Sequence, residues 1–473
     1  MCLDGQWEFA ESDEYEPELR LSEEDYPEEI IVPFCRESEL SGLGRKGFVS
    51  HVWYRRTFER PADWTAPRTL LHIGASDWKT EVWVNGRRVG EHIGGSAAFA
   101  FDVTSALVEG QNSVIIHVFD DTRSGLQALG KQCPALESFG CLYTRTTGIW
   151  QSVWLEGIGD TYIKGFQITP DVDNSRLLVN AQVEGHCSGL TLLVVAKADG
   201  KLAGREAIAL DWRNNHLVVD LSEKHLWSPS DPFLYDLELT VRDGDKVVDQ
   251  VESYFGLRKI SIKGAAILLN DEPVFQRLVL DQGFYPDGIW TASSDTELKA
   301  DIERSMAVGF NGARLHQKVF EPRFLYWADK LGYMVWGEFP NWGLKYENPA
   351  IDPPVMSEWA ELVQRDRNHP ALVGWCPFNE TPSSAIRLQN AVVDLTRKLD
   401  PSRPVLDTSG WTHGLADPEV MDQHDYDQNP ESFRKRWLED YEVGMLAPAP
   451  YGAASGLLPF FVSEWGCIGG GIG

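Results

Sequence analysis

Two glutamates in the second half of the chain each follow a short apolar run that is typical of a β-strand. Glu380 closes the segment 374–380 (GWCPFNE), and Glu464 lies within 460–466 (FFVSEWG). Two carboxyl groups held about 5 to 5.5 Å apart can cleave a glycosidic bond with retention, because one attacks the sugar while the other donates and then accepts a proton. Either glutamate alone could equally cap a following helix. The pair therefore indicates hydrolysis of a sugar bond, provided that the fold brings the two together.

The residues after Arg258 alternate between strand-like and helix-like patterns. In 295–308, for example, Leu298, Ile302 and Met306 recur every four positions and mark one face of a helix. We expect strands at 274–280, 312–315, 333–336, 371–375, 405–407, 420–424 and 460–462, and helices at 295–308, 321–331, 354–367 and 385–399. This alternation is typical of a (β/α)₈ TIM barrel, whose chemistry lies at the C-terminal ends of the strands. By strand count both glutamates belong at that mouth, after strands four and seven.

Other side chains that directly follow expected strands are further candidates for the mouth of the barrel. They are Asp281 and Gln282 after strand one, His316 after strand two, Glu338 and Trp342 after strand three, and Trp411 after strand five. Each could contact a sugar hydroxyl or stack on a sugar ring, and each could equally support the site or lie at its rim. We expect Asp281, His316 and Trp411 to contact the substrate.

The first 258 residues read as two all-β domains. Residues 1–159 contain short alternating strands, and an Asn85-Gly86 turn follows one of them, which is a strong hairpin signal. We expect a sugar-binding-like jelly-roll β-sandwich there. Residues 160–258 repeat the style with strands near 177–183, 190–197, 216–221 and 235–242, which favours an immunoglobulin-like β-sandwich.

The third domain, residues 259–473, is shorter than a complete barrel. Its length of about 215 residues compares with roughly 250 for the fold, and only nine residues follow Glu464. We therefore expect a barrel that lacks its last βα unit, which would leave strand edges unpaired. The chain is then a fragment, or a partner or swapped segment closes the barrel, or the region is rearranged.

Composition narrows the partners and the location. Lys and Arg number 43 against 71 Asp and Glu, so the formal net charge is −28, which argues against nucleic acid or an anionic membrane surface. The seven cysteines include no CxxC and no zinc spacing, and are expected to be reduced. The N-terminal segment 1–18 has neither a basic region nor an apolar core typical of a signal peptide. We expect a cytoplasmic protein without a membrane span.

Motifs for other chemistries do not occur in the sequence. There is no HExxH, GxxxxGK[ST], GxSxG or EF-hand loop. Hydrolysis by two carboxylates needs only water, so we expect neither a cofactor nor a metal.

Motifs along nearly the whole chain resemble glycoside hydrolase family 2, which includes β-galactosidases, β-glucuronidases and β-mannosidases. They are 5–9 (GQWEF), 54–58 (YRRTF), 82–86 (VWVNG), 148–154 (GIWQSVW), 254–258 (YFGLR), 309–316 (GFNGARLH), 368–372 (NHPAL) and the pair 379–380 (NE). Together they are specific, whereas the NE dipeptide alone would carry no weight.

The resemblance implies a role for particular residues. Glu380 corresponds to the general acid/base, Asn379 to the residue that hydrogen-bonds the sugar 2-hydroxyl, and Glu464 to the nucleophile. Arg314 corresponds to an arginine near the nucleophile, and a fixed cation there would keep Glu464 ionised. Glu380 is then the partner that carries the proton.

Tyr426 and His424 match the family less closely. Tyr426 follows expected strand six, where the resemblance implies a tyrosine that donates to the nucleophile, and His424 lies two residues before it. Both are expected to belong to the substrate site, with packing of a loop as the alternative.

Two functions therefore stay open at this point. The resemblance favours a retaining exo-β-glycosidase that hydrolyses terminal β-glycosides, with β-galactoside or β-glucuronide as the leading substrates. The alternative is a catalytically impaired or non-catalytic carbohydrate-binding protein on the same scaffold. A carbohydrate is the expected partner in both cases, and formation of a homo-oligomer is left open.

Overall fold

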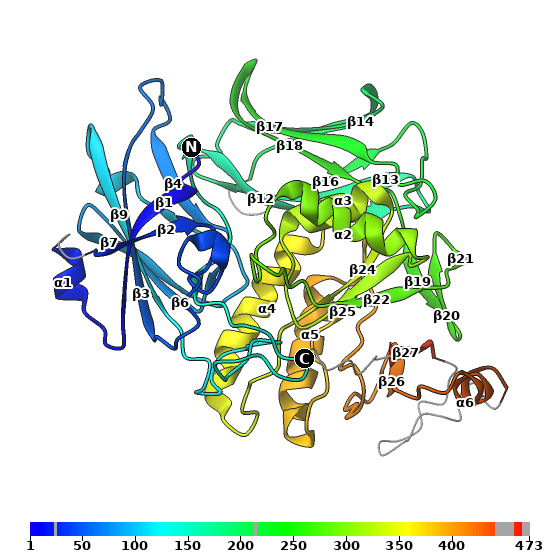
Figure 1. The fold of residues 1–473 in the computed structure, drawn as a ribbon. Coiled ribbons are helices and arrows are strands. Elements are labelled where there is room, and N and C mark those ends of the chain that lie inside the picture. The colour runs from blue at the N-terminus through cyan, green and yellow to red at the C-terminus, as the bar shows by residue number, and fades with distance from the viewer. Residues whose placement is uncertain (23–25, 212–214, 440–457, 466–473) are drawn as a thin grey trace.

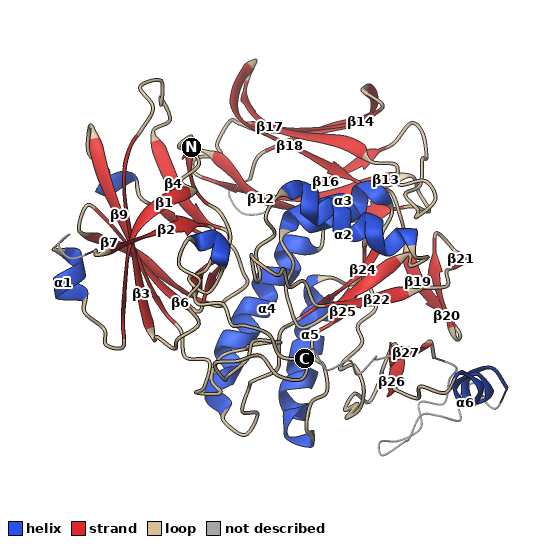
Figure 2. Ribbon diagram, viewed as in Figure 1, coloured by secondary structure: helices blue, strands red, loops and turns tan. Residues whose placement is uncertain are grey.

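A computed structural model describes residues 1–22, 26–211, 215–439 and 458–465 of the chain. The fold has three parts, as Figure 1 shows: a blue N-terminal β-sandwich, a second β-sandwich in cyan and green, and a C-terminal part in green to red that combines a parallel sheet with helices. Figure 2 shows that strands dominate the first two parts, whereas the longer helices gather around the third. This division agrees with the expected order of domains, and the exact boundaries stay a prediction.

The N-terminal part packs one large antiparallel sheet against a smaller one. The Asn85-Gly86 turn joins β6 (Lys79–Val84) and β7 (Arg87–Ile93) as expected, and both residues have positive φ angles, as a tight hairpin requires. The large sheet has the order β2 (Glu28–Val32), β1 (Gly5–Ser12), β3 (His51–Glu59), β9 (Gln111–Phe119), β6 (Lys79–Val84) and β7 (Arg87–Ile93). The smaller has the order β11 (Val153–Ile158), β4 (Arg68–Ile73) and β8 (Phe99–Asp102). A β-sandwich is confirmed, and its jelly-roll connectivity stays a prediction.

The second part is the expected immunoglobulin-like sandwich. Alternate residues of β14 (Thr191–Ala198) are buried, because only one face of each sheet meets the core. That strand lies between β15 (Lys201–Ala209) and β17 (Tyr235–Asp243), and β18 (Lys246–Phe255) completes its sheet. The facing sheet has the order β12 (Tyr162–Asp171), β13 (Arg176–Glu184) and β16 (Asn215–Asp220).

The third part contains the parallel strands and helices predicted for a barrel. Strands β22 (Leu278–Asp281), β23 (Gly312–Leu315), β24 (Met334–Glu338) and β25 (Leu372–Cys376) form one sheet in chain order, and every pair is parallel. The helices are α2 (Asp295–Ala307), α3 (Pro322–Leu331), α4 (Asp352–Asp366) and α5 (Ile386–Leu399). All residues of β23 and β25 are buried, because side chains cover both faces of such a sheet.

Strand β22 begins four residues later than predicted. The side chain of Asn311 accepts from the N–H of Arg277 at 2.7 Å and donates to the carbonyl of Phe275 at 2.9 Å. These bonds hold the residues before Leu278 to a loop, so they do not join the ladder of the sheet. The periodicity of apolar residues gives no sign of a side chain that takes backbone hydrogen bonds away from a strand.

The expected fifth strand is reduced to isolated bridges. Trp375 donates to the carbonyl of Pro404 at 3.0 Å and accepts from the N–H of Leu406 at 2.9 Å. The N–H of Val405 instead donates to the carboxylate of Glu419 at 2.7 Å, and Pro404 has no N–H to give. A regular strand therefore does not form there, although the chain still runs alongside β25.

The sixth and seventh expected strands pair with each other in parallel. They are β26 (Met421–Asp425) and β27 (Phe460–Trp465), and a short helix α6 (Pro430–Arg434) follows β26. Six of the seven predicted strands are thus present, and the fifth is reduced to isolated bridges. The absence of an eighth βα unit stays a prediction.

A long segment of the N-terminal part reaches over the third part, which sequence reasoning did not predict. This mouth loop, residues 120–147, follows β9 and runs in cyan toward α4 and α5 in Figure 1. Its Leu129 and Gly130 donate to the carbonyls of Trp342 and Pro340, each at 2.9 Å. A Cβ at Gly130 would lie 2.1 Å from the carbonyl oxygen of Gln317, so this close approach requires glycine.

Two further expectations concern the chain as a whole. In the ranges that the structure describes, no helix is both long and apolar enough to cross a membrane. The cysteines of those ranges are all free thiols, and Cys467 lies outside them.

Candidate active site

The structure brings the two predicted carboxylates together. Glu464 lies on β27, and Glu380 lies four residues beyond the end of β25. One oxygen of each carboxylate and one ring nitrogen of His424 all lie within 4.8 Å of one another. Glu380 has a φ of 49°, a left-handed conformation that is costly for a residue with a side chain and that recurs at functional sites.

Glu464 is held as a carboxylate anion. Arg314 donates to its Oε1, and the hydroxyl of Tyr426 donates to its Oε2 at 2.6 Å. Burial by itself would raise the pKa of Glu464, but the cationic Arg314, with His316, His424 and Tyr426, lowers it below its usual value. The family resemblance implies that Glu464 is the nucleophile, and Glu464 is in the ionised form that such a role requires.

Arg314 is fixed between two carboxylates. From the third position of β23 it donates through Nη1 to Glu338 at 2.5 Å, and the same nitrogen lies 3.3 Å from Oδ1 of Asn379. Burial would raise the pKa of Glu338, but Arg314, His316 and Gln317 outweigh it and lower the pKa to about 2. Glu338 thus holds the arginine in place, which gives a defined role to a residue that the sequence placed only at the mouth.

His424 lies between the two carboxylates. Its Nδ1 is 3.0 Å from Oε1 of Glu380, and its Nε2 is 3.6 Å from Oε1 of Glu464. Nε2 also lies 2.9 Å from the hydroxyl of Ser409, which fixes the plane of the ring. The residue expected to contact substrate is thus in direct contact with both carboxylates.

Two residues that sequence reasoning missed position Asn379. Asn341 accepts from the N–H of Asn379 at 2.8 Å and donates to its carbonyl at 3.0 Å. Gln317 in turn donates to Asn341 at 2.7 Å and to Glu338 at 3.0 Å. Gln317 and Asn341 follow strands two and three within three residues, so the rule used for the other candidates could have found them.

Several buried nitrogens around Glu464 have no hydrogen-bond partner among the described residues. They are Nε2 of His316, Nδ2 of Asn379 and Nε of Arg314, whereas Nδ1 of His316 lies 3.1 Å from Oε1 of Glu338. Nδ1 of His316 lies 3.8 Å from Oε1 of Glu464, and burial lowers the pKa of His316. Buried polar groups are usually paired, so unpaired ones beside the carboxylates are free to hydrogen-bond a ligand.

Trp411 and Asp281 have neither carboxylate among their described contacts, and their contact with substrate stays a prediction. Trp411 is 52% exposed, and its ring meets that of His424 edge-on at 5.6 Å, so it forms part of the rim. Asp281 accepts from the N–H of Gly283 at 3.0 Å, and burial raises its pKa to about 6. Its described contacts include neither glutamate, because its carboxylate closes the turn after β22.

A metal would compete with groups that already occupy this site. Glu380, His424 and Glu464 could supply ligand atoms, but both oxygens of Glu464 are bound, one of them by the guanidinium of Arg314. A cation beside Arg314 would be repelled, and Mg²⁺ prefers a shell of oxygens. These residues therefore do not fit a resident Mg²⁺ ion, and the expectation that no metal is needed stays a prediction.

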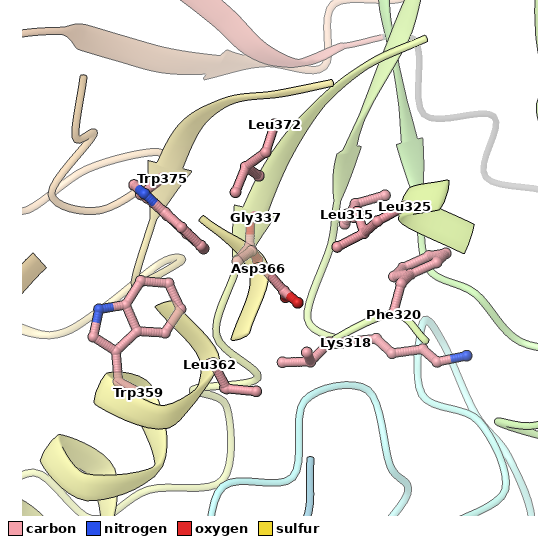
Figure 3. A pocket seen from close by; sticks show the side chains of 12 residues that line it. Leu315, Lys318, Phe320, Leu325, Gly337, Trp359, Leu362, Asp366, Leu372 and Trp375 are labelled. Atoms are coloured by element: carbon pink, nitrogen blue, oxygen red, sulfur yellow. The ribbon is translucent and has the colours of Figure 1, made fainter. Parts of the chain in front are cut away.

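A cavity drawn in Figure 3 is lined by residues of the strands and of the helices that cover them; it touches Glu338 but neither Glu380 nor Glu464. It is lined mostly by apolar side chains of the strands and of α3 and α4, including Leu315, Leu325, Trp359, Leu362 and Trp375. It belongs to the packing between strands and helices, whereas the carboxylates lie at the ends of the strands.

We expect Tyr426→Phe to lower kcat/KM about 10- to 100-fold for an aryl β-glycoside, because a hydrogen bond to a charged group contributes about 1.5–3 kcal/mol. The bond removed is the one at 2.6 Å to Glu464. Steady-state kinetics checks this, with Tyr326→Phe on α3 as the matched control. An unchanged rate in Tyr426→Phe would show that the tyrosine only packs the loop.

Parallel βα units that bring two carboxylates together beyond β25 and on β27 are the arrangement expected of a barrel enzyme that cleaves glycosidic bonds. Models of glycosyl hydrolases family 2 match the sugar binding domain at residues 45–155, the central domain at 161–258 and the TIM barrel domain at 290–442. The chain belongs to this family.

Similar proteins carry related names. A β-glucuronidase of Paenibacillus borealis is 24% identical over 85% of this chain and 72% of its own length. A putative β-glucuronidase of Formosa agariphila is 27% identical over 78% of this chain, and a β-galactosidase of Lactococcus lactis is 28% identical over 80%. The chain spans only 34% and 36% of the lengths of these two relatives.

A solved structure shares the fold. The β-glucuronidase of Ruminococcus gnavus, in complex with N1-substituted uronic isofagomine, has a TM-score of 0.77 at 21% identity. The match covers 90% of this chain and 76% of that one.

Proposed function

We propose that this protein is a retaining exo-β-glycosidase that hydrolyses terminal β-glycosides by double displacement. The observation that carries the proposal is the approach of Glu380 and Glu464, which have carboxylate oxygens within 4.8 Å of each other. Carboxyl groups about 5 to 5.5 Å apart suit retention, whereas inversion needs a wider gap that admits a water. The substrate is also a proposal, because the relatives whose names suggest it are longer than this chain.

The two carboxylates divide the work by their surroundings. Glu464 has the cationic Arg314 on one oxygen and the Tyr426 hydroxyl on the other, so its charge is stabilised. Glu380 has no such cation among its described contacts and meets the ring of His424 instead. Glu464 is therefore the nucleophile, and Glu380 is the acid.

In the first step, an oxygen of Glu464 forms a bond to the anomeric carbon while the bond to the leaving oxygen breaks. Glu380 transfers its proton to that oxygen, so the aglycone departs as an alcohol. In the second step, Glu380 takes a proton from water, whose oxygen attacks the anomeric carbon and releases Glu464. Arg314 then hydrogen-bonds the carboxylate that Glu464 regains. His424 keeps Glu380 within reach of both the leaving oxygen and the oxygen of the attacking water.

The substrate is proposed to be a β-galactoside or a β-glucuronide. Support comes from the names of the relatives and from the unpaired Nε2 of His316 and Nδ2 of Asn379, which suit sugar hydroxyls. The mouth loop also packs against the segment after β24, beside the site, and a wall there favours an end residue of a glycan. The chain has both carboxylates together with Arg314 and Tyr426. Their presence disfavours the alternative of a carbohydrate-binding protein without turnover.

We expect a 2-deoxy-2-fluoro β-glycoside with a good leaving group to label Glu464 covalently. The fluorine slows both steps, and the reactive leaving group restores only the first, so the glycosyl-enzyme accumulates. Mass spectrometry of the intact protein and of its peptides would show one added sugar, located on Glu464. A label on another residue, or turnover that gives the inverted anomer by NMR, would contradict the proposal.

A further inference from the structure

The mouth loop places one lysine of the N-terminal part beside the candidate active site. Lys131 directly follows Gly130, whose backbone is bonded to the barrel at Pro340. Its Nζ lies 3.6 Å from the centre of the Trp342 ring, and the residue is only 4% exposed. Lys131 is thus held against the C-terminal end of the parallel sheet by a domain distant in sequence.

The charge of Lys131 has no carboxylate partner among the described residues. The polar contact given to its Nζ is the thiol of Cys141 at 3.5 Å. By contrast, the buried Arg314 and Arg36 meet carboxylates. The buried Lys318 and Arg258 donate to backbone carbonyls, a contact that is not given for Nζ of Lys131. Buried charges are normally paired, because removing a lone ion from water is costly. A thiol and an aromatic face do not neutralise an ammonium group.

The same tryptophan connects Lys131 to the carboxylates. The ring of Trp342 meets that of His316 edge-on at 6.4 Å, and His316 in turn lies 3.8 Å from Glu464. The N–H of Trp342 donates to Gln317 at 3.0 Å, which fixes the backbone of this wall. The ammonium group therefore lies on the side of the site formed by the segments after β23 and β24.

We propose that Lys131 binds a carboxylate of the substrate, so that the site takes the glycoside of a uronic acid. The inference rests on the proposed function and deepens it, because it selects the anionic class of sugar over the neutral one. The formal net charge of −28 repels anions from the protein as a whole. The buried ammonium group of Lys131, on the Trp342 side of the site, supplies the local attraction that an anionic sugar needs.

The test compares Lys131→Met with the unchanged protein on 4-nitrophenyl β-glucuronide and 4-nitrophenyl β-galactoside. We expect kcat/KM for the glucuronide to fall about 100-fold or more, since losing the partner of a desolvated charge is costly, and kcat/KM for the galactoside to change less than about threefold. Lys131→Arg keeps the charge and is expected to restore part of the glucuronide activity. Lys299→Met is the control, because the half-buried Lys299 lies over the Trp327 ring at 5.5 Å on helix α2.

An equal loss on both substrates, or no loss on either, would overturn the inference. Thermal unfolding identifies the case in which Lys131 only fastens the mouth loop, because the melting temperature then falls as both activities fall. Calorimetry with D-glucuronate and D-galactose separates this inference from the proposed function. If the protein hydrolyses neither glycoside but prefers glucuronate, and Lys131→Met loses that preference, the inference stands while the proposed function fails.

Discussion

Replacing Glu464 by glutamine is expected to lower kcat/KM for an aryl β-glycoside by at least about 10⁴-fold, on the scale of losing a covalent nucleophile. The amide keeps the shape of the side chain but cannot form the glycosyl ester. Glu380→Gln is expected to lower the rate about 10²- to 10⁴-fold, the usual contribution of general acid–base catalysis. Both variants should fold, because neither change alters the size of the side chain.

The leaving group and an added anion separate the two roles. A 2,4-dinitrophenol leaving group needs no proton, so the first step of Glu380→Ala is expected to stay fast with that substrate. Azide added to Glu380→Ala should yield the β-glycosyl azide, whereas azide added to Glu464→Ala should yield the α-glycosyl azide, because the anion enters from opposite faces of the sugar. If each variant gave the azide expected of the other, the roles assigned to Glu380 and Glu464 would be exchanged.

A surface glutamate provides the matched control. Glu303→Gln changes a carboxylate that pairs with Lys299 on α2, and its activity is expected to equal that of the unchanged protein. Full activity in Glu380→Gln or Glu464→Gln would show that the paired carboxylates are not the catalytic groups. Sugar binding without turnover in the unchanged protein would favour the binding alternative.

Arg314→Met is expected to lower the free energy of unfolding by about 3–5 kcal/mol, the usual cost of removing one partner of a buried ion pair. The arginine is the shared cation of Glu338 and Glu464, so its loss leaves two buried negative charges. Urea unfolding followed by tryptophan fluorescence measures this change. Arg314→Lys keeps a charge without the planar fork and should lose less stability.

The same substitution is expected to move the acidic limb of the pH profile. Arg314 lowers the pKa of Glu464, so removing it raises that pKa. The attacking form is the ionised one, and it is therefore lost at a higher pH in Arg314→Met. The acidic limb of kcat/KM should shift upward, and less so in Arg314→Lys. An acidic limb that stays in place in both variants would show that Glu464 does not control it.

Much of the fold follows from local patterns. Alternating apolar residues predicted both sandwiches, and helical spacing placed α2 and α3 within one residue of their observed bounds. The same periodicity missed the late start of β22, where Asn311 takes the backbone bonds, and the irregular fifth strand after Pro404. Cytoplasmic location, oligomeric state and the missing barrel unit stay predictions.

The sequence by itself determined which residues carry the proposed chemistry. Glu380, Glu464, Arg314 and Tyr426 were found from strand ends and family motifs, because those signals are local. Tertiary structure alone decided what surrounds them: His424 lies between the carboxylates, Glu338 holds Arg314, and Lys131 arrives from another domain. Such contacts join residues that are distant along the chain, so the packing of whole domains sets them and no local pattern records them.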